Sequence, residues 1–186
     1  MLTDDFLTTA VIPISFTCNI VTDNILVSNV YDLKIGIDPL PDGADNLGIG
    51  FQKIKFLFDA QLQNSVILDH SHPLVESLGT LENNLVLCPC EPYDFYVGSV
   101  LMAKLQAITE KYFEIQYVSI ASLVGDNIQY NIIDPYDSEL ELDGKHWWNS
   151  DDISTGATTV VTWDDLKLTE NPVFNPKVIR GGLSEG

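Results

Sequence analysis

The chain has few cysteines, few basic residues and no long apolar run. Three cysteines in 186 residues are too few for a disulfide scaffold in a chain of this length. No window of about 20 apolar residues occurs, so the sequence predicts no membrane-spanning helix. Nine lysines and arginines stand against 27 aspartates and glutamates, which gives a formal net charge of −18. Such a chain repels phosphates, so we expect neither direct nucleic-acid binding nor membrane binding.

Recognisable catalytic and targeting motifs are also missing. The sequence contains neither the G-x-S-x-G pattern of serine hydrolases nor the G-x-x-x-x-G-K-[ST] phosphate loop. It begins Met1-Leu2-Thr3-Asp4-Asp5, acidic where a secretory signal would be basic, so we expect a cytoplasmic protein. Hydrophobic residues make up 45 % of the chain, enough for a packed core.

The spacing of apolar residues predicts an α+β fold, in which an antiparallel sheet packs against one long helix and one or two short helices. The long helix is expected over residues 92–111, because Pro92 suits a helix start and Asp94 suits the first turn. Within it, Gly98 and Ala103 are expected to allow the close approach of a neighbour. Shorter helices are predicted over 51–62 and from 72 onward, a loop over 38–46, and strands over 6–20, 25–37, 65–68, 85–87, 113–124 and 127–133. The first two strands and the last two are expected to form hairpins, because turn-forming residues separate them.

We expect three parts along the chain. Residues 1–134 form the α+β core domain, residues 135–170 an acidic, tryptophan-rich segment that wraps it, and residues 171–186 a loosely ordered tail. A short β-rich run occurs within the second part, at residues 158–163. The tail contains two Asn-Pro pairs and a Gly-Gly, which favour loose order.

The acidic segment carries the strongest pattern in the sequence. Between Asp126 and Asp165 there are ten carboxylates and one cation, Lys145. In an extended segment, alternating acids would form an anionic face, while Leu140 and Leu142 would form an apolar one. The four acids that alternate in this way are Asp137, Glu139, Glu141 and Asp143.

Two adjacent tryptophans follow the alternating acids. Trp147 and Trp148 cannot both face one core if the segment is extended. They therefore either latch the segment onto the domain or contact a partner, since tryptophan is enriched at interface anchor points. The sequence predicts a partner-binding surface made of Asp137, Glu139, Glu141, Asp143, Trp147, Trp148, Asp151 and Asp152.

Two weaker patterns concern metal binding and cysteine chemistry. His70 and His72 flank Ser71 and could hold a metal with a third ligand from elsewhere, such as Asp94, Asp134 or His146; alternatively they belong to a polar loop. We predict no cofactor. Cys88-Pro89-Cys90 is better explained as a strand-to-helix turn than as a redox or zinc motif.

Parts of the chain from residue 51 to 150 resemble uncharacterised proteins of large tailed bacteriophages. The resemblance lies in Phe51–Phe58, Leu62-Gln63-Asn64-Ser65, His72-Pro73-Leu74, Glu91-Pro92-Tyr93-Asp94 and Met102–Ile108. It carries no known active site. It implies a viral protein made in the bacterial cytoplasm.

Three functions are compatible with these patterns. The first is a non-enzymatic acidic protein that binds a basic partner and blocks a nucleic-acid-binding host protein by electrostatic or DNA mimicry. Acids at alternate strand positions lie about 6.6 Å apart, close to the spacing of every second phosphate along one DNA strand. The second is a phage virion or assembly protein that docks through its C-terminal segment. The third is a metal-dependent enzyme that uses His70 and His72.

Overall fold

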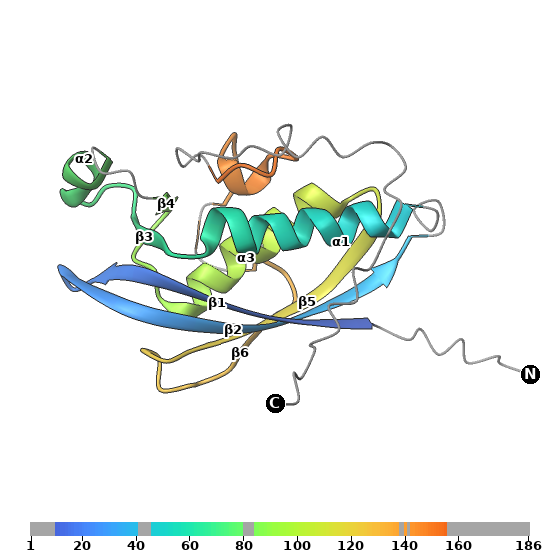
Figure 1. Cartoon of the computed structure of the whole chain (residues 1–186), viewed down its shortest axis with the longest axis horizontal. Coiled ribbons are helices and arrows are strands. Elements are labelled where there is room, and N and C mark those ends of the chain that lie inside the picture. Colours follow the sequence, from blue (N-terminus) through green and yellow to red (C-terminus); the bar gives the residue numbers. More distant parts are fainter. Residues whose placement is uncertain (1–9, 41–45, 80–83, 138–139, 141, 156–186) are drawn as a thin grey trace, which may run out of the picture.

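The computed structural model describes residues 10–40, 46–79, 84–137, 140 and 142–155. These residues form six strands in a single sheet, ordered β4-β3-β1-β2-β5-β6, with helices on one of its faces (Figure 1). The predicted α+β class is confirmed. The predicted antiparallel arrangement is wrong in part, because β1, β3 and β4 run parallel to one another and the sheet is mixed.

A long hairpin forms the centre of the sheet. Strands β1 (Ala10–Thr22) and β2 (Ile25–Pro39) are paired along their whole shared length, as predicted. Asp23 and Asn24 join them with φ angles of 49° and 60°, the left-handed pair that a tight hairpin turn requires. Strand β2 continues through the first two residues of the predicted loop, and residues 41–45 of that loop lie outside the described residues.

The parallel strands follow two crossover connections. Helix α1 (Leu47–Phe56) leads into a π-helical turn, η2 (Leu57–Leu62), and then into β3 (Ser65–Asp69). Helix α2 (Leu74–Gly79) precedes β4 (Leu85–Cys88). The α2 connection joins two adjacent parallel strands, β3 and β4. The α1 connection leads from β2 past β1 to β3, which pairs parallel with β1. The predicted helix over 51–62 is confirmed, with an earlier start.

The second predicted hairpin is confirmed but is shorter than expected. Strand β5 (Phe113–Ser122) pairs with β2 on one side and with β6 (Tyr130–Ile132) on the other. Only residues 118–120 of β5 face β6. The first half of β5 therefore has a strand neighbour on one side only, among the residues that the structure describes.

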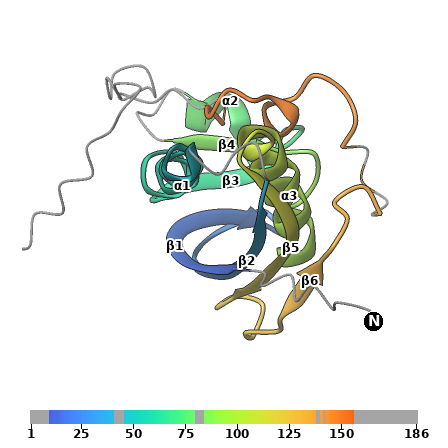
Figure 2. The ribbon, with the colours of Figure 1, turned by 90° about the vertical axis from the view of Figure 1, so that its right-hand side faces the viewer.

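Helix α3 (Asp94–Thr109) is the long helix that the sequence predicts, and it is buried on most sides. The sheet lies below it, α1 lies beside it, and residues 142–155 lie above it, on the side away from the sheet (Figures 1 and 2). Ala103 packs against Leu142 and Trp148 in this upper contact. Gly98 faces Ile120 of β5 and Ile132 of β6. The expected role of Gly98 and Ala103 in close packing is confirmed.

Replacing Gly98 with alanine should destabilise the protein by about 1–2 kcal/mol, since overpacking outweighs the helix propensity of alanine. A Cβ atom there would lie 2.6 Å from Cδ1 of Ile132 and 2.7 Å from Cγ2 of Ile120. Gly48 in α1 is the matched control, because a Cβ there meets nothing within 4 Å. Gly48→Ala should stabilise by about 0.5–1 kcal/mol in urea unfolding. Equal effects of the two substitutions would contradict the packing described.

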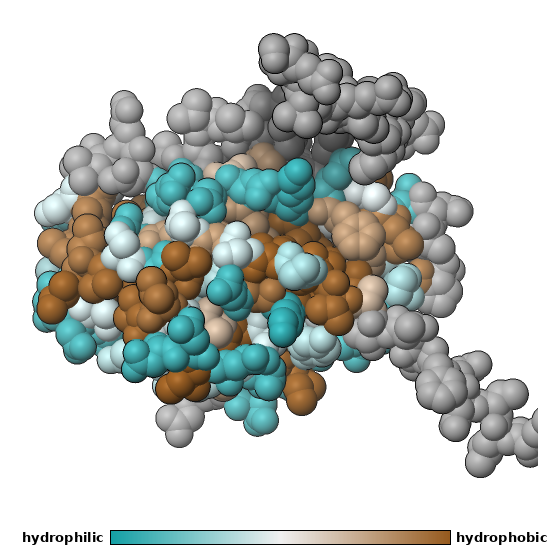
Figure 3. All heavy atoms as spheres, turned by 60° about the horizontal axis from the view of Figure 1, so that its bottom comes forward, coloured by the Kyte–Doolittle hydropathy of each residue, from teal (hydrophilic) through white to brown (hydrophobic). Residues whose placement is uncertain are grey.

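None of the described helices lies on the other face of the sheet (Figure 1). Polar residues such as Ser28, Asp32 and Lys34 alternate there with buried residues that point into the core. Figure 3 shows polar and apolar side chains interspersed across this face. Residues 156–186, which include the predicted 158–163 strand and the predicted tail, lie outside the described residues. None of the described helices combines the length and the apolar character needed to cross a bilayer.

Candidate functional site

A buried lysine holds the acidic segment on α3. Lys104 is 0 % exposed, and its Nζ donates hydrogen bonds to the carbonyl oxygens of Trp147 (2.6 Å), Ser150 (2.9 Å) and Asp152. An ammonium group has three hydrogens to donate, so these carbonyls match its full capacity. Burial lowers the pKa of Lys104 to about 8, while the negative charges of Asp152 and Asp151 act in the opposite direction. We call this contact the lysine clamp.

Trp148 is a second anchor of the same segment. It is only 5 % exposed, stacks on His146 and donates from Nε1 to the carbonyl oxygen of Leu142 (3.0 Å). The short 3₁₀ helix η3 (Trp147–Asn149) allows Trp147 to turn inward as well, where its Nε1 donates to the carbonyl oxygen of Leu87 in β4 (2.8 Å). The latch alternative therefore describes both indoles. The sequence predicted that only one of the two indoles would face the core, because an extended backbone was assumed, and the 3₁₀ turn removes that restriction.

The aspartates of the segment point to solvent. Asp137, Asp143, Asp151 and Asp152 are all exposed, and so is Asp134. In the described part of the chain, the ion pairs are Lys55–Asp59 and His70–Asp69, so none of these five carboxylates has a cation within 4.0 Å. Glu139 and Glu141, the other two predicted members of the surface, lie outside the described residues.

The backbone of the segment is not regularly extended. The N–H of Leu142 donates to the carbonyl oxygen of Leu140 (2.9 Å), which closes a tight turn. Leu142 is 1 % exposed and Leu140 is half-buried, so the predicted apolar side faces the protein. The regularly extended backbone that DNA mimicry would use is interrupted at this turn.

A groove borders the first half of β5. Its volume is about 650 Å³, and α3, β5 and the chain after β6 contribute to its walls. Tyr136 and Ile133 give it apolar surface, and Ile133 is 75 % exposed. The described residues that line it include three carboxylates and no cation: Leu40, Gln106, Glu110, Phe113, Glu114, Ile115, Gln116, Ile133, Asp134 and Tyr136.

A second cavity, of about 580 Å³, lies where the segment meets β4. Both tryptophans line it, together with His70 and His146. Trp147 and Trp148 use their indole N–H groups inside the protein, as described above, so the cavity offers mainly aromatic surface. It brings together His70 and His146, one of the predicted metal-binding combinations.

The two histidines of the predicted metal site have different partners. The Nδ1 of His70 lies 3.1 Å from the carbonyl oxygen of Cys88 and 3.4 Å from Oδ1 of Asp69. His72 accepts from the N–H of Leu74 through Nδ1 and contacts Asn24 through Nε2, so both of its ring nitrogens are engaged. Across the described ranges, no three His, Cys, Asp or Glu side chains are grouped so as to hold a metal ion.

The other two suggested metal ligands lie elsewhere. Asp94 is buried at the start of α3 and accepts a hydrogen bond from the hydroxyl of Ser122 (2.8 Å). Burial raises the pKa of Asp94, while the Ser122 hydrogen bonds lower it. Asp134 lines the groove beside β5 and caps its own turn by accepting from the N–H of Tyr136.

The cysteines are protonated thiols in the fold. Burial raises the pKa of Cys18 to about 12 and that of Cys90 to about 11, and it also raises the pKa of Cys88. All three thiols are free. A thiolate nucleophile is therefore disfavoured at these positions, which agrees with the interpretation of Cys88-Pro89-Cys90 as a turn.

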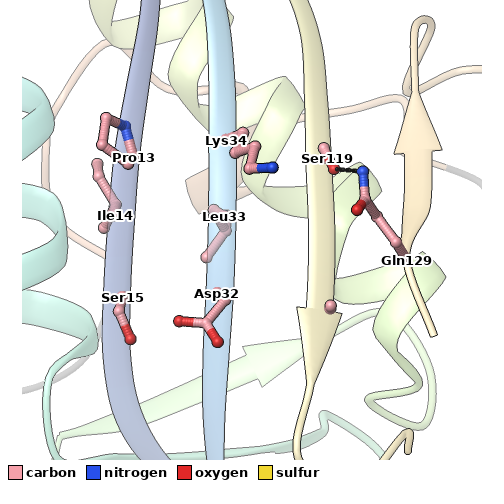
Figure 4. Close-up of a pocket in the computed structure, with 9 residues that line it drawn as sticks. Pro13, Ile14, Ser15, Asp32, Leu33, Lys34, Ser119 and Gln129 are labelled. Carbon is pink, nitrogen blue, oxygen red and sulfur yellow. Dashed lines mark hydrogen bonds between the residues drawn. The ribbon is translucent and has the colours of Figure 1, made fainter. Parts of the chain in front are cut away.

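The open face of the sheet holds a shallow pocket of about 490 Å³. Figure 4 shows Asp32 and Lys34 of β2 lying between side chains of β1 and β5. Ser119 accepts a hydrogen bond from Gln129 (2.6 Å), and neither histidine nor cysteine is among the lining residues, so this pocket holds no activated nucleophile.

Neither a family model, nor a curated protein, nor a solved structure matches the chain.

Proposed function

We propose that this protein is a non-enzymatic binding protein whose acidic C-terminal segment engages a basic protein partner. The exposed carboxylates of Asp134, Asp137, Asp143, Asp151 and Asp152 carry the proposal, since none of them has a cation within 4.0 Å among the described residues. Charges of one sign gathered on a surface speed the encounter with a partner of the opposite sign and weaken contact with phosphates. The lysine clamp and Trp148 support it, because they hold the acidic segment in one place on a rigid helix.

The resemblance to phage proteins suggests where the partner would be found. A phage protein made in a bacterial cytoplasm meets basic host proteins, many of which bind nucleic acids. Blocking one of them is the sharper form of the proposal, and it rests on charge alone because the backbone turns between Leu140 and Leu142 and is not regularly extended there.

Neutralising the exposed aspartates should weaken binding about tenfold, since each exposed charge pair contributes a few tenths of a kcal/mol to about 1 kcal/mol. The variant changes Asp137, Asp143, Asp151 and Asp152 to asparagine. The wild type and the variant are immobilised and exposed to bacterial lysate, and the retained proteins are identified by mass spectrometry over a salt gradient.

The control for this experiment has the same net charge. It neutralises four exposed acids elsewhere: Asp32, Asp59, Glu76 and Asp126. We expect the control to retain the same basic protein as the wild type, with release as the salt concentration rises. Equal weakening by the two sets would assign binding to overall charge, and retention that ignores salt would contradict an electrostatic mechanism.

A further inference from the structure

We infer that the groove beside β5 is a strand-addition site that takes an extended, lysine- or arginine-rich segment of the partner. The inference rests on the proposed function and identifies the kind of partner segment involved. It starts from the free edge of the sheet: β6 covers only residues 118–120 of β5, and the chain leaves the ladder at Asp134-Pro135.

The free edge is long enough for a short strand. Residues 113–117 have β2 on one side and no strand on the other, within the part of the chain that the structure describes. Five residues of β-strand span about 16 Å. The register with β2 shifts at Gln116, so the outward N–H and C=O groups alternate regularly over residues 113–115, and the irregularity separates them from residues 118–120, which pair with β6. An extended peptide that continues the line of β6 would complete this ladder, which is a common mode of peptide recognition.

Carboxylates stand on both sides of this edge. Glu114 of β5 is exposed next to the buried Phe113 and Ile115, so it belongs to the open face of the sheet. Glu110 follows the last turn of α3 and belongs to the helical layer. Asp134 lies at the far end of the groove. Alternate side chains of an added strand point to these two layers in turn, so basic residues on either side of the peptide would meet a carboxylate.

The same charges argue against self-association. A second copy of the chain, paired through the same edge, would bring Glu110 and Glu114 of both molecules close together, and like charges across a strand pair are destabilising. The apolar surface of Ile133 and Tyr136 still favours burial by a partner, since these side chains are 75 % and 49 % exposed. A basic peptide would both neutralise the carboxylates and bury the apolar side chains.

The test uses the full chain and a fluorescent heptapeptide of alternating lysine and valine, capped at both ends. Two further peptides carry N-methyl groups on the odd or on the even residues. Strand addition uses one edge of the peptide only, so one methylated peptide should bind about tenfold more weakly and the other like the parent. Equal binding of the two methylated peptides would overturn the inference.

Matched protein variants locate the site. Glu114→Lys and Ile133→Asp should each weaken binding of the heptapeptide about tenfold. Glu76→Lys and Ile25→Asp are the controls, because both residues are exposed and lie away from the groove, and they should bind like the wild type. Thermal melting checks that all four variants are folded.

The outcomes separate this inference from the proposed function. One outcome is that the peptide binds the wild type, that the four-aspartate variant abolishes this binding, and that Glu114→Lys and Ile133→Asp leave it unchanged. This result would exclude the groove and assign binding to the acidic segment. If the peptide does not bind at low salt, the inference is overturned, and the proposed function is decided separately by the capture of basic proteins from lysate. Occupation of the groove by residues 158–163 of the same chain would also prevent binding, and it would overturn the inference.

Discussion

Replacing Lys104 with methionine is expected to lower the free energy of unfolding by about 3 kcal/mol and to release residues 142–155 from α3. Methionine fills a similar volume and removes the cost of burying a charge. It also leaves the carbonyl oxygens of Trp147, Ser150 and Asp152 without their donor. Each unsatisfied buried carbonyl costs about 1–3 kcal/mol, so the loss outweighs the relief. Urea unfolding measures the total, and hydrogen exchange locates the release.

The effect of this substitution should depend on pH. The pKa of Lys104 is about 8 in the folded protein and about 10.4 in an unfolded chain. Between these values the unfolded state binds more protons, so the stability of the wild type rises with pH, by up to about 1.4 kcal/mol per unit. The gap between wild type and Lys104→Met should therefore widen from pH 8 to pH 10 and stay constant below pH 7. Other titrating groups are common to both proteins and cancel in the difference.

Lys111→Met provides the control for the clamp. Lys111 is exposed just after α3, so its replacement should change stability by no more than about 0.5 kcal/mol. Two results would contradict the stabilising role of the lysine clamp. One is a loss of stability in Lys104→Met as small as that in Lys111→Met, and the other is a stability difference between wild type and Lys104→Met that narrows as the pH rises.

Trp148→Ala should cost about 3–5 kcal/mol, the range for truncating a large buried aromatic side chain. The indole packs against Val100, Ala103 and Leu142 and donates to the carbonyl oxygen of Leu142. Trp148→Phe is the milder comparison, since it retains an aromatic ring and loses the hydrogen bond, at about 1 kcal/mol. Chemical denaturation gives both values, and intrinsic fluorescence reports the exposure of Trp147 when the segment detaches.

The clamp and the indole hold one segment, so their effects should not add. Once Lys104→Met has released residues 142–155, Trp148→Ala has less left to break, and the double variant should lose less than the sum of the two single losses. Additive losses would show that the segment detaches in two independent pieces. Weaker capture of the basic partner by either single variant would tie the position of the segment to its binding.

The sequence predicts those elements whose signals are local. The long helix has Pro92 and Asp94 at its start, and the structure begins it at Asp94. The first hairpin has Asp23-Asn24 between two runs of β-forming residues, and both residues adopt positive φ there. Boundaries such as these follow from backbone preferences that act within a few residues.

The order and direction of the strands depend on contacts far apart in the chain. Residues 65–68 are buried on both sides, a pattern typical of parallel strands between layers. That pattern could have indicated the parallel pairing of β1 with β3. The spacing of apolar residues alone did not indicate this pairing, because a short apolar run is compatible with a parallel or an antiparallel strand.

In the candidate site, too, some features follow from local sequence and others depend on contacts between distant residues. The exposure of Asp137, Asp143, Asp151 and Asp152 follows from their charge and could be predicted. The role of Lys104 could not be derived from periodicity, although a single lysine within the apolar run Val100–Ile108 is a signal of a buried cation. The groove beside β5 could be predicted only if the length of β6 were known. That length depends on where the chain leaves the sheet, near Pro135.

The two edges of the sheet differ in how they are covered. On the β4 margin, the indole of Trp147 donates to the carbonyl oxygen of Leu87 and covers the outermost strand. On the β5 side, the short β6 leaves residues 113–117 of β5 without a second strand neighbour among the residues that the structure describes. A peptide strand added beside β5 would find no second free edge on the β4 side of the sheet. Each molecule should therefore bind one peptide, and the complexes should not polymerise into fibres.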